Sequence, residues 1–332
     1  MTFLIANTEE NDKSYSKNEI KSAILNNDPI DDLLHVIMVV SNPCQFARRY
    51  ILAKEFISRM EKENNVLLYI TELVYGDQQF RITDRKNKKH LQIRTSEPPI
   101  WHKENMINIG VNNLFPKTWK AMAWIDADIE FENTEWANDT LKILNGSCDI
   151  VQLFSHAIDM DLDEDAMNIF PGFGFQYSKN RRYSKNGILK MWHPGYAWAC
   201  TRKAYEKMGG LYEFSILGAG DHQMALSLIG RANISLNENV HEDYIQSILI
   251  FQQKIKHLRL GYTPGMIRHY FHGSKKNRKY NERWKILVNH QYSPNIHITK
   301  NQLGLLIPTN ECPKEMLRDI YEYFEQRNED NV

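Results

Sequence analysis

The apolar residues of the chain follow a pattern that alternates between strands and helices. Residues 35–40 (HVIMVV) and 66–70 (VLLYI) are continuous apolar runs, which are typical of strands covered on both faces. Later runs repeat this signal at 91–94, 121–125 and 149–154. Between the first two strands, a helical stripe is formed by Phe46, Tyr50, Ala53, Ile57 and Met60. We therefore predict an α/β fold: a doubly wound, mixed but mainly parallel sheet, flanked by helices in a single domain.

Capping residues indicate where several helices begin and end. Ser41 or Asn42 can cap the first helix, with Pro43 in its first turn. Further helices are expected over 201–208, closed by Gly209 and Gly210, from Asp221 onward, over 244–258 and over 313–326. The acidic stretch 159–165 and the basic stretch 177–187 carry neither pattern, so we expect two loops that could act as flaps.

Three regions of the chain differ in composition. Residues 1–32 are polar and rich in Asn, Ser and Lys, as in a loosely attached N-terminal extension. Residues 33–298 contain the strand and helix units and form the predicted domain. Residues 299–332 then follow as a C-terminal helical extension.

Charge and apolar content exclude some classes of partner. The 41 Lys and Arg residues equal the 41 Asp and Glu residues, so no overall field attracts nucleic acid or an anionic membrane. No apolar run approaches the roughly 18 residues of a membrane span, and the first residues lack the basic region of a signal peptide. The four cysteines have no CxxC spacing, which fits reduced thiols. We expect a cytoplasmic protein without a membrane span or a nucleic-acid partner.

The sharpest chemical signal is AWIDADIEF (123–131), where Asp126 and Asp128 follow a buried strand. Ligands of open α/β sheets bind at the carboxyl ends of strands. Paired carboxylates bind a divalent cation such as Mn²⁺ or Mg²⁺, which can neutralise a departing diphosphate. The spacing alone also fits two residues that merely end the strand. The surrounding strand and helix units favour the metal site.

A second candidate region is 191–230, which combines glycines, aromatic residues and an acid. Glycines such as Gly195 and Gly220 permit close backbone approach. The aromatic candidates to stack on a sugar are Trp192, Tyr196 and Trp198. Asp221 follows GAG and has two alternatives: it caps a helix, or it serves as a general base or anchor for an acceptor hydroxyl.

Together these motifs resemble nucleotide-sugar glycosyltransferases of the GT-A fold, particularly the galactosyltransferase-like groups. The resemblance covers about residues 35 to 290, and residues 33–298 would be the GT-A domain. The motifs that carry it are SNP after the first strand, WHKENMINIG (101–110), AWIDADIEF, the tryptophan, glycine and GGL elements at 192–211, GAGD (218–221) and FHG (271–273). They are specific for the fold and weak for the sugar.

The resemblance implies that Asp128 binds the metal directly, that Asp126 contacts the ribose or the metal, and that a late histidine adds a ligand. RHYFHG offers His269 and His272. Residues three apart in a strand face opposite sides, so we expect one of the two to reach the metal. We favour His272, because Gly273 beside it allows close approach to a diphosphate.

The resemblance also implies contacts to the donor. Nucleoside contacts would come from Ser41, Asn42 and Glu72. The donor pocket would be shaped by Arg94, Trp101, Lys103, Glu104 and Asn108. The diphosphate would be clamped from the basic stretch by Lys275, Lys276, Arg278 and Tyr280. Helix capping and solvated charged faces are the structural alternatives for these residues.

The implied activity is metal-dependent transfer of a hexose from a UDP-sugar, or less readily a GDP-sugar, to a glycan, glycoconjugate or other hydroxyl acceptor. Asp221 as base would give inversion. GAGDHQMA has a single acid where several inverting galactosyltransferases have consecutive acids, so the stereochemistry stays open. The alternatives are an inactive sugar-binding module on this scaffold and a sugar nucleotidyltransferase, whose usual glycine-rich loop is absent from SNPCQFARR.

Overall fold

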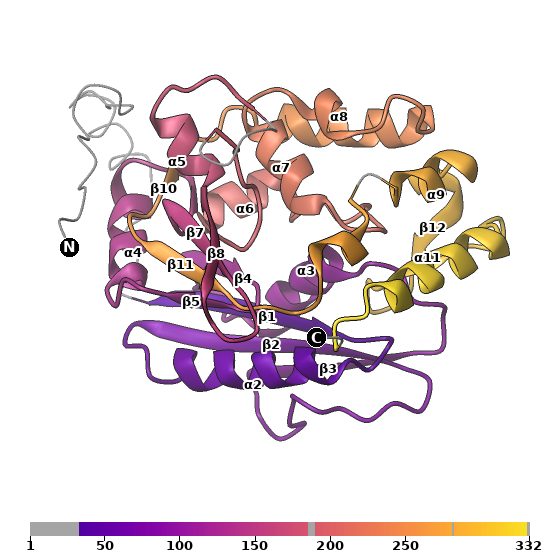
Figure 1. The fold of residues 1–332 in the computed structure, drawn as a ribbon, viewed down its shortest axis with the longest axis horizontal. Coiled ribbons are helices and arrows are strands. Elements are labelled where there is room, and N and C mark those ends of the chain that lie inside the picture. The colour runs from indigo at the N-terminus through magenta and orange to yellow at the C-terminus, as the bar shows by residue number, and fades with distance from the viewer. Residues whose placement is uncertain (1–32, 185–189, 281, 331–332) are drawn as a thin grey trace.

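A computed structural model describes residues 33–184, 190–280 and 282–330, without the side chain of Lys275. The predicted extension 1–32 therefore lies outside the described residues. The central sheet has seven strands in the order β10-β6-β9-β4-β1-β2-β3 (Figure 1). They are β1 (Leu34–Ser41), β2 (Val66–Tyr75), β3 (His90–Thr95), β4 (Ala121–Ile125), β6 (Ile150–Gln152), β9 (Ala197–Thr201) and β10 (Leu260–Tyr262). β9 is antiparallel to both neighbours and the other pairs are parallel, which confirms the predicted mixed, mainly parallel sheet.

Two smaller sheets and the helices complete the fold. A four-stranded sheet contains, in the order β5-β11-β7-β8, the strands β5 (Ile129–Phe131), β11 (Met266–His269), β7 (His156–Met160) and β8 (Ala166–Pro171). A hairpin pairs β12 (Ile298–Lys300) with β13 (Leu306–Pro308). The helices are α2 (Ala47–Met60), α3 (Lys103–Leu114), α4 (Trp136–Gly146), α5 (Phe173–Ser178), α6 (Arg202–Met208), α7 (Gly220–Leu228), α8 (Glu242–Ile255), α9 (Trp284–Asn289), α10 (Pro294–His297) and α11 (Lys314–Gln326), with short 3-10 turns at Ala232–Ser235 and Lys275–Arg278.

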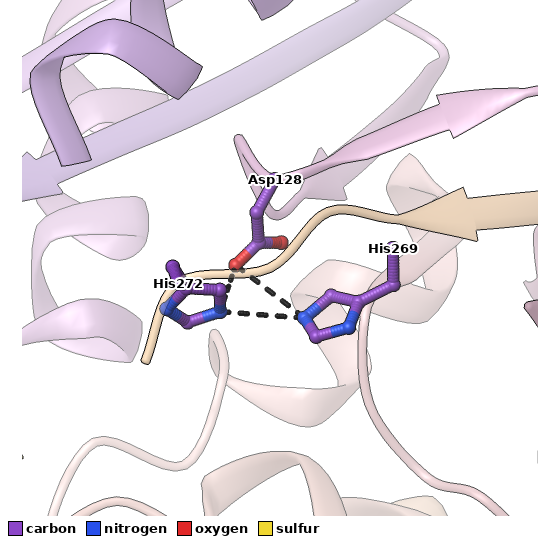
Figure 2. A group of neighbouring side chains, drawn as sticks. All are labelled: Asp128, His269 and His272. Atoms are coloured by element: carbon purple, nitrogen blue, oxygen red, sulfur yellow. Dashed lines mark hydrogen bonds and ion pairs between the residues drawn. The ribbon is translucent and has the colours of Figure 1, made fainter. Parts of the chain in front are cut away.

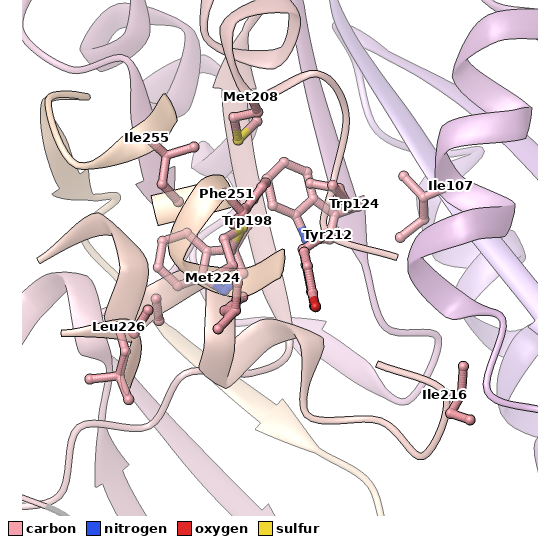
Figure 3. Packing of buried hydrophobic residues seen from close by; sticks show 14 of the residues in the cluster. Ile107, Trp124, Trp198, Met208, Tyr212, Ile216, Met224, Leu226, Phe251 and Ile255 are labelled. Carbon is pink, nitrogen blue, oxygen red and sulfur yellow. The ribbon is translucent and has the colours of Figure 1, made fainter. Parts of the chain in front are cut away.

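Alternation along the central strands divides the core into two layers. In β1, Val36 and Met38 pack with α2 and α4 on one face, while Ile37 points to the other face. On that second face Trp124 of β4 and Trp198 of β9 pack with residues of α6, α7 and α8 (Figure 3). Complete burial of one such large side chain stabilises the folded state by about 1.5–3 kcal/mol. The packing of several of them attaches a layer of helices to each face of the sheet. The carboxyl ends of β1 and β4 are thereby fixed at one edge.

The first helix begins later than its capping signal predicts. α2 starts at Ala47, and the side chain of its N-cap residue Phe46 makes no capping hydrogen bond. Residues 42–46 instead form a turn that the side-chain amide of Asn42 closes. Its Oδ1 atom accepts the N–H of Phe46 (3.0 Å), and its Nδ2 atom donates to the C=O of Phe46 (2.8 Å). The predicted caps at Ser41 and Asn42, with Pro43 in the first turn, are therefore wrong.

The acidic stretch 159–165 is not simply a loop. Its first residues end β7, which pairs with β8 in an antiparallel hairpin. The sequence does not predict β7, because its segment HAIDM lacks a strict alternation. Its buried residues are Ala157, Asp159 and Met160, and one of them is an acid. In the basic stretch 177–187, residues 177–178 end α5, and residues 185–189 lie outside the described part of the chain.

The region predicted as a C-terminal extension packs closely against the domain. Met316 and Ile320 of α11 are fully buried in the larger core cluster. The Nε2 atom of His102 lies 2.9 Å from the carbonyl oxygen of Leu306 in β13. Residues of α11 also line the main cavity, as described below.

Two observations bear on the expectations from composition. Among the described residues, no helix combines the length and apolarity that a membrane crossing requires. None of the four cysteines forms a disulfide among the described residues: Cys148, Cys200 and Cys312 are buried, and Cys44 is half-buried.

Candidate active site and metal centre

Strand pairing brings the DxD element beside the late histidines. Asp126 and Asp128 lie in the turn between β4 and β5. β5 pairs antiparallel with β11, with Ile129 opposite His269. The N–H of Tyr270 donates to the carbonyl oxygen of Asp128 at 2.8 Å. The sheet therefore joins two segments that are far apart in the sequence.

Asp128, His269 and His272 form one compact cluster. The Oδ2 atom of Asp128 lies 2.7 Å from Nε2 of His272 and 3.8 Å from Nε2 of His269. The two Nε2 atoms are 3.3 Å apart, and Figure 2 shows the carboxylate and both rings pointing toward one another. β11 ends at His269, so strand alternation does not extend to His272. The expectation that only one histidine can reach the cluster is wrong.

A buried carboxylate orients the ring of His269. In the pairing of β11 with β7, His269 lies opposite Asp159, and its Nδ1 atom is 2.9 Å from Asp159 Oδ1. The hydroxyl of Tyr196 donates to the same oxygen at 3.1 Å. An ionised carboxylate can only accept, so Nδ1 of His269 carries the proton and Nε2 presents its lone pair to the cluster. Tyr196 has a φ of 79°, a costly conformation for a residue other than glycine.

The cluster fits a divalent metal ion. The ligand atoms of Asp128, His269 and His272 all lie within 4.8 Å of one another. Asp128 Oδ1 is buried and has no hydrogen-bond partner among the described residues. Burial opposes ionisation of Asp128, but the two histidines lower the pKa of its carboxyl, which therefore stays ionised. One carboxylate and two imidazoles suit a first-row transition ion better than Mg²⁺.

Asp126 faces a different neighbour. Its Oδ1 atom forms an ion pair with Nζ of Lys103, at the start of α3, and both side chains are about a quarter exposed. Burial raises the pKa of Asp126 to about 6, against the opposing charge of Lys103. Asp126 is not a member of the metal-binding cluster. Its contact to the ribose or the metal stays a prediction.

A cavity of about 990 Å³ joins most of the predicted residues. Lining residues from the donor and metal predictions are Ser41, Asn42, Trp101, Lys103, Glu104, Asp126, Asp128, His269, His272, Arg278 and Tyr280. Those from the acceptor predictions are Trp192, Gly195, Tyr196 and Asp221. Glu72, Arg94, Asn108, Trp198, Gly220 and Lys276 do not line it.

Two predicted donor contacts serve the fold instead. Glu72 is buried, and its carboxylate accepts the N–H groups of Arg81 and Thr83 at 2.8 Å each and the Thr83 hydroxyl at 2.6 Å. Asn108 bonds through its side chain to the N–H (2.8 Å) and C=O (2.9 Å) of Leu211. Each of these polar side chains therefore supplies hydrogen-bond partners to backbone groups of a neighbouring segment.

Other predicted residues lie at the periphery or in the core. Arg94 is exposed and bonds to the carbonyl oxygen of Gly76. Trp198 is buried, and its Nε1–H donates to the carbonyl oxygen of Pro194 at 2.8 Å, so it cannot stack on a sugar in the main cavity. Lys276 is exposed, whereas Arg278 of the same basic stretch places Nη2 2.7 Å from His272 Nε2.

Asp221 lies in the first turn of α7 without capping it. The N-cap position belongs to Ala219, which has a φ of 80°. Asp221 Oδ1 accepts the N–H of His222 at 2.7 Å. A Cβ atom at Gly195 would lie 2.8 Å from Asp221 Oδ2, so glycine is required there for the carboxylate to occupy this position. The capping role for Asp221 is therefore wrong, and its carboxylate borders the cavity.

Glu104 is a buried acid in the same part of the cavity wall. Its carboxylate packs against Gly220, where a Cβ atom would clash with it. Burial raises the pKa of Glu104 to about 7, while the neighbouring Lys103 opposes this shift. Lys103 thus lies among the acids Asp126, Asp221 and Glu104.

Sequence reasoning missed several residues of the site. Asp159 lies in a stretch that the sequence predicts as a loop, because polar and apolar residues do not alternate strictly in HAIDM. Cavity-lining residues from α11 and beyond are Tyr323, Phe324 and Arg327. No local pattern predicts them, because their approach depends on packing of distant segments.

No family model matches the chain, and no curated protein matches its sequence. Among solved structures, a Drosophila β-1,4-galactosyltransferase 7 mutant in complex with manganese, UDP-Gal and xylobiose is similar at 11% identity, covering 87% of this chain and 99% of that chain, with a TM-score of 0.39. A putative nucleotide-diphospho-sugar transferase from Desulfovibrio desulfuricans has 11% identity, covers 88% and 97%, and scores 0.35. A 4-diphosphocytidyl-2C-methyl-D-erythritol synthase from Anaerococcus prevotii has 10% identity, covers 71% and 90%, and scores 0.30. All three likenesses are distant.

Proposed function

We propose that the chain is a metal-dependent glycosyltransferase that transfers a hexose from a nucleotide-sugar to a hydroxyl acceptor. A UDP-sugar is the expected donor ahead of a GDP-sugar, and a glycan or glycoconjugate is the expected acceptor. The supporting observation is that one cavity of about 990 Å³ is lined both by the cluster of Asp128, His269 and His272 and by the carboxylate of Asp221.

The metal ligands would be Asp128, His269 and His272, with Asp126 close enough in sequence to contact the ribose or the same ion. Two imidazoles in the ligand set favour Mn²⁺ over Mg²⁺. When bound, the ion supplies a Lewis acid that neutralises charge on the departing diphosphate. Asp159 keeps the lone pair of His269 directed at this position through its bond to Nδ1 (2.9 Å).

Cationic side chains on two sides of the cavity would hold the donor. Arg278 lies beside the metal cluster, and Lys103 lies beside Asp126. Both can donate charge-assisted hydrogen bonds to phosphate oxygens. Ser41 and Asn42, at the carboxyl end of β1, line the same cavity and would contact the nucleoside.

Asp221 would act as the general base. Its carboxylate borders the cavity opposite Gly195, where no side chain blocks the approach of an acceptor. It would accept the proton of the attacking hydroxyl, and direct displacement then gives inversion at the sugar carbon. Trp192 and Tyr196 line the same cavity and would contact the sugar.

A thermal-shift screen tests the donor assignment. UDP-, GDP- and CMP-sugars are added with and without Mn²⁺, because a ligand that binds only the native state raises the melting temperature. We expect a UDP-sugar to raise it only in the presence of Mn²⁺. No shift from any nucleotide-sugar would contradict the proposal.

Asp128→Ala should abolish sugar transfer and donor hydrolysis while the circular dichroism spectrum stays unchanged, because it removes the anionic metal ligand. Asp163→Ala is the matched control, since Asp163 is an exposed acid outside the cavity. Full metal-dependent activity in Asp128→Ala would overturn the assignment. Binding of a nucleotide-sugar without release of UDP or GDP, for any acceptor offered, would instead indicate a binding module.

A further inference from the structure

The residues that follow α11 are buried to a degree unusual for charged side chains. Arg327 is 6% exposed and Glu329 is 3% exposed. Charged residues are almost never fully buried unless they are paired. In Figure 1 the yellow chain runs from α11 back toward the central sheet. We refer to residues 327–330 as the 327–330 segment.

Glu329 connects this segment to a candidate metal ligand. Its carboxylate accepts from Arg49 at 2.5 and 2.7 Å and pairs with Nη2 of Arg327 at 2.8 Å. Its Oε2 atom lies 3.7 Å from Nδ1 of His272. Two guanidinium groups, from Arg49 and Arg327, therefore pair with this one carboxylate, which lies as an anionic group behind the His272 ring.

Asp330 fixes the same segment to the start of α2. Its two carboxylate oxygens accept the backbone N–H groups of Ala47 and Arg48, each at 2.8 Å. The N-terminal amides of a helix lack partners within the helix and favour a negative charge. The side chain of Arg48 donates in turn to the carbonyl oxygen of Phe271 at 2.9 Å, next to His272.

The backbones of the two segments are in direct contact. Gly273 has a φ of 88°, and a Cβ atom there would lie 3.0 Å from Glu329 Cα and 3.2 Å from the Arg327 carbonyl oxygen. Any side chain at Gly273 would push the 327–330 segment away from His272. The close packing explains the glycine by a contact within the protein.

We propose that Glu329 belongs to the metal centre as the positioning residue for His272. Asp159 holds Nδ1 of His269 by a hydrogen bond, and Glu329 provides the corresponding anion on the Nδ1 side of His272. The two rings would thus be supported by carboxylates from distant parts of the chain. This inference rests on the metal centre of the proposed function.

The expected effect of Glu329 lies at the low end of the range for such supporting residues. Loss of a supporting carboxylate typically weakens metal binding by about 10- to 100-fold. The 3.7 Å separation is too long for a hydrogen bond, so the contact acts through charge and through the fixed position of the ring. We expect Glu329→Gln to weaken Mn²⁺ binding about 10-fold.

Calorimetric titration with Mn²⁺ alone tests the inference without any substrate. Glu329→Gln should weaken binding about 10-fold. Asp330→Asn is the matched control, because it weakens the attachment to α2 but leaves Glu329 tied to Arg49 and Arg327. Its affinity for Mn²⁺ should stay within about twofold of the unsubstituted protein, below the effect of a lost supporting residue. Equal losses in both variants would show a merely structural role and overturn the inference.

Asp128→Asn separates this inference from the proposed function. If Asp128→Asn abolishes Mn²⁺ binding and Glu329→Gln leaves it unchanged, the metal centre stands and the role of Glu329 is refuted. If Asp128→Asn binds Mn²⁺ as well as the unsubstituted protein, the metal centre itself is refuted.

Hydrogen exchange of the unsubstituted protein covers the case in which Glu329→Gln does not fold. Mn²⁺ should slow amide exchange in residues 270–273 and in the 327–330 segment together, because the two backbones are packed against each other. Protection of residues 270–273 without any change in the 327–330 segment would overturn the inference.

Discussion

Asp126 and Asp128 are separated by one residue, yet they occupy opposite chemical environments. Asp128 faces the imidazoles of His269 and His272, which lower its pKa. Asp126 faces Lys103, and its pKa is raised to about 6 by burial. The difference arises from the elements around the turn: β11 supplies the histidines, and α3 supplies the lysine. A DxD spacing therefore does not define a metal site, because the neighbouring segments decide which carboxylate joins a group of candidate ligands.

The largest expected effect separates the two aspartates by metal affinity. Asp128→Asn removes the anionic member of the cluster and should weaken Mn²⁺ binding by more than about 100-fold, beyond the loss of a supporting residue. Asp126→Asn, the matched variant, should weaken it less than about 10-fold in the absence of donor, since Asp126 faces Lys103. Isothermal titration with Mn²⁺ measures both. Similar losses in the two variants would erase the distinction.

A smaller effect is expected from the partner of Asp126. Lys103→Met removes a cation from the donor side of the cavity but keeps most of the side-chain volume. We expect the KM for the nucleotide-sugar to rise about 10-fold, in line with a lost charge-assisted bond, while Mn²⁺ affinity without donor is unchanged. Steady-state kinetics and titration test this prediction. A fall in Mn²⁺ affinity as large as that of Asp128→Asn would contradict this prediction and show that Lys103 is needed for metal binding.

The smallest effect concerns Glu104, on the lysine side of the comparison. Burial raises its pKa to about 7 from 4.5, so the folded protein retains this proton while the unfolded chain releases it. Stability is then lost as pH rises from 4.5 to about 7 and stays lower above that range. Glu104→Gln removes this loss and should stabilise the protein by on the order of 1 kcal/mol at pH 8. This is less than the full pKa shift implies, because Glu104 lines the cavity.

Urea unfolding of Glu104→Gln at pH 8 and at pH 4.5 measures that difference. The gain should shrink to a small remainder at pH 4.5, where the folded protein is protonated and the unfolded chain is half protonated. Glu97→Gln is the matched control, because Glu97 is exposed in the segment before α3. A gain of equal size at both pH values would show that the effect does not arise from ionisation of Glu104.

Local patterns predicted the central strands β1, β2, β3, β4 and β6, but not β9 or β10. Buried apolar runs carried this signal, and the strand before Asp126 predicted which edge of the sheet holds the candidate site. The choice between the two histidines was not local, since it depended on where β11 ends. For Asp221 the sequence left two alternatives, a helix cap or a role at the acceptor. The structure excludes the cap, because Ala219 occupies the N-cap position, and Asp221 lines the cavity.

Burial explains most of the failures among the predicted site residues. Glu72 and Asn108 are polar residues at positions that resemble donor contacts in the sequence, yet each satisfies buried backbone groups. A single sequence does not distinguish a polar residue that supports a loop from one that binds a ligand. Glu329 and Arg49 were not predicted at all. They form an ion pair across a large sequence separation, and such a pair leaves no periodic signal in the sequence.

The start of α2 depends on a residue that is made much later. Ala47 and Arg48 emerge early from the ribosome, whereas Asp330, which accepts their N–H groups, emerges almost 300 residues afterwards. Contacts between such distant residues close large loops and form late in folding. During synthesis, the contacts of Asp330 with α2 and of Glu329 with His272 therefore form only after α11 has docked. The proposed metal centre should therefore bind its ion only after residue 330 has left the ribosome.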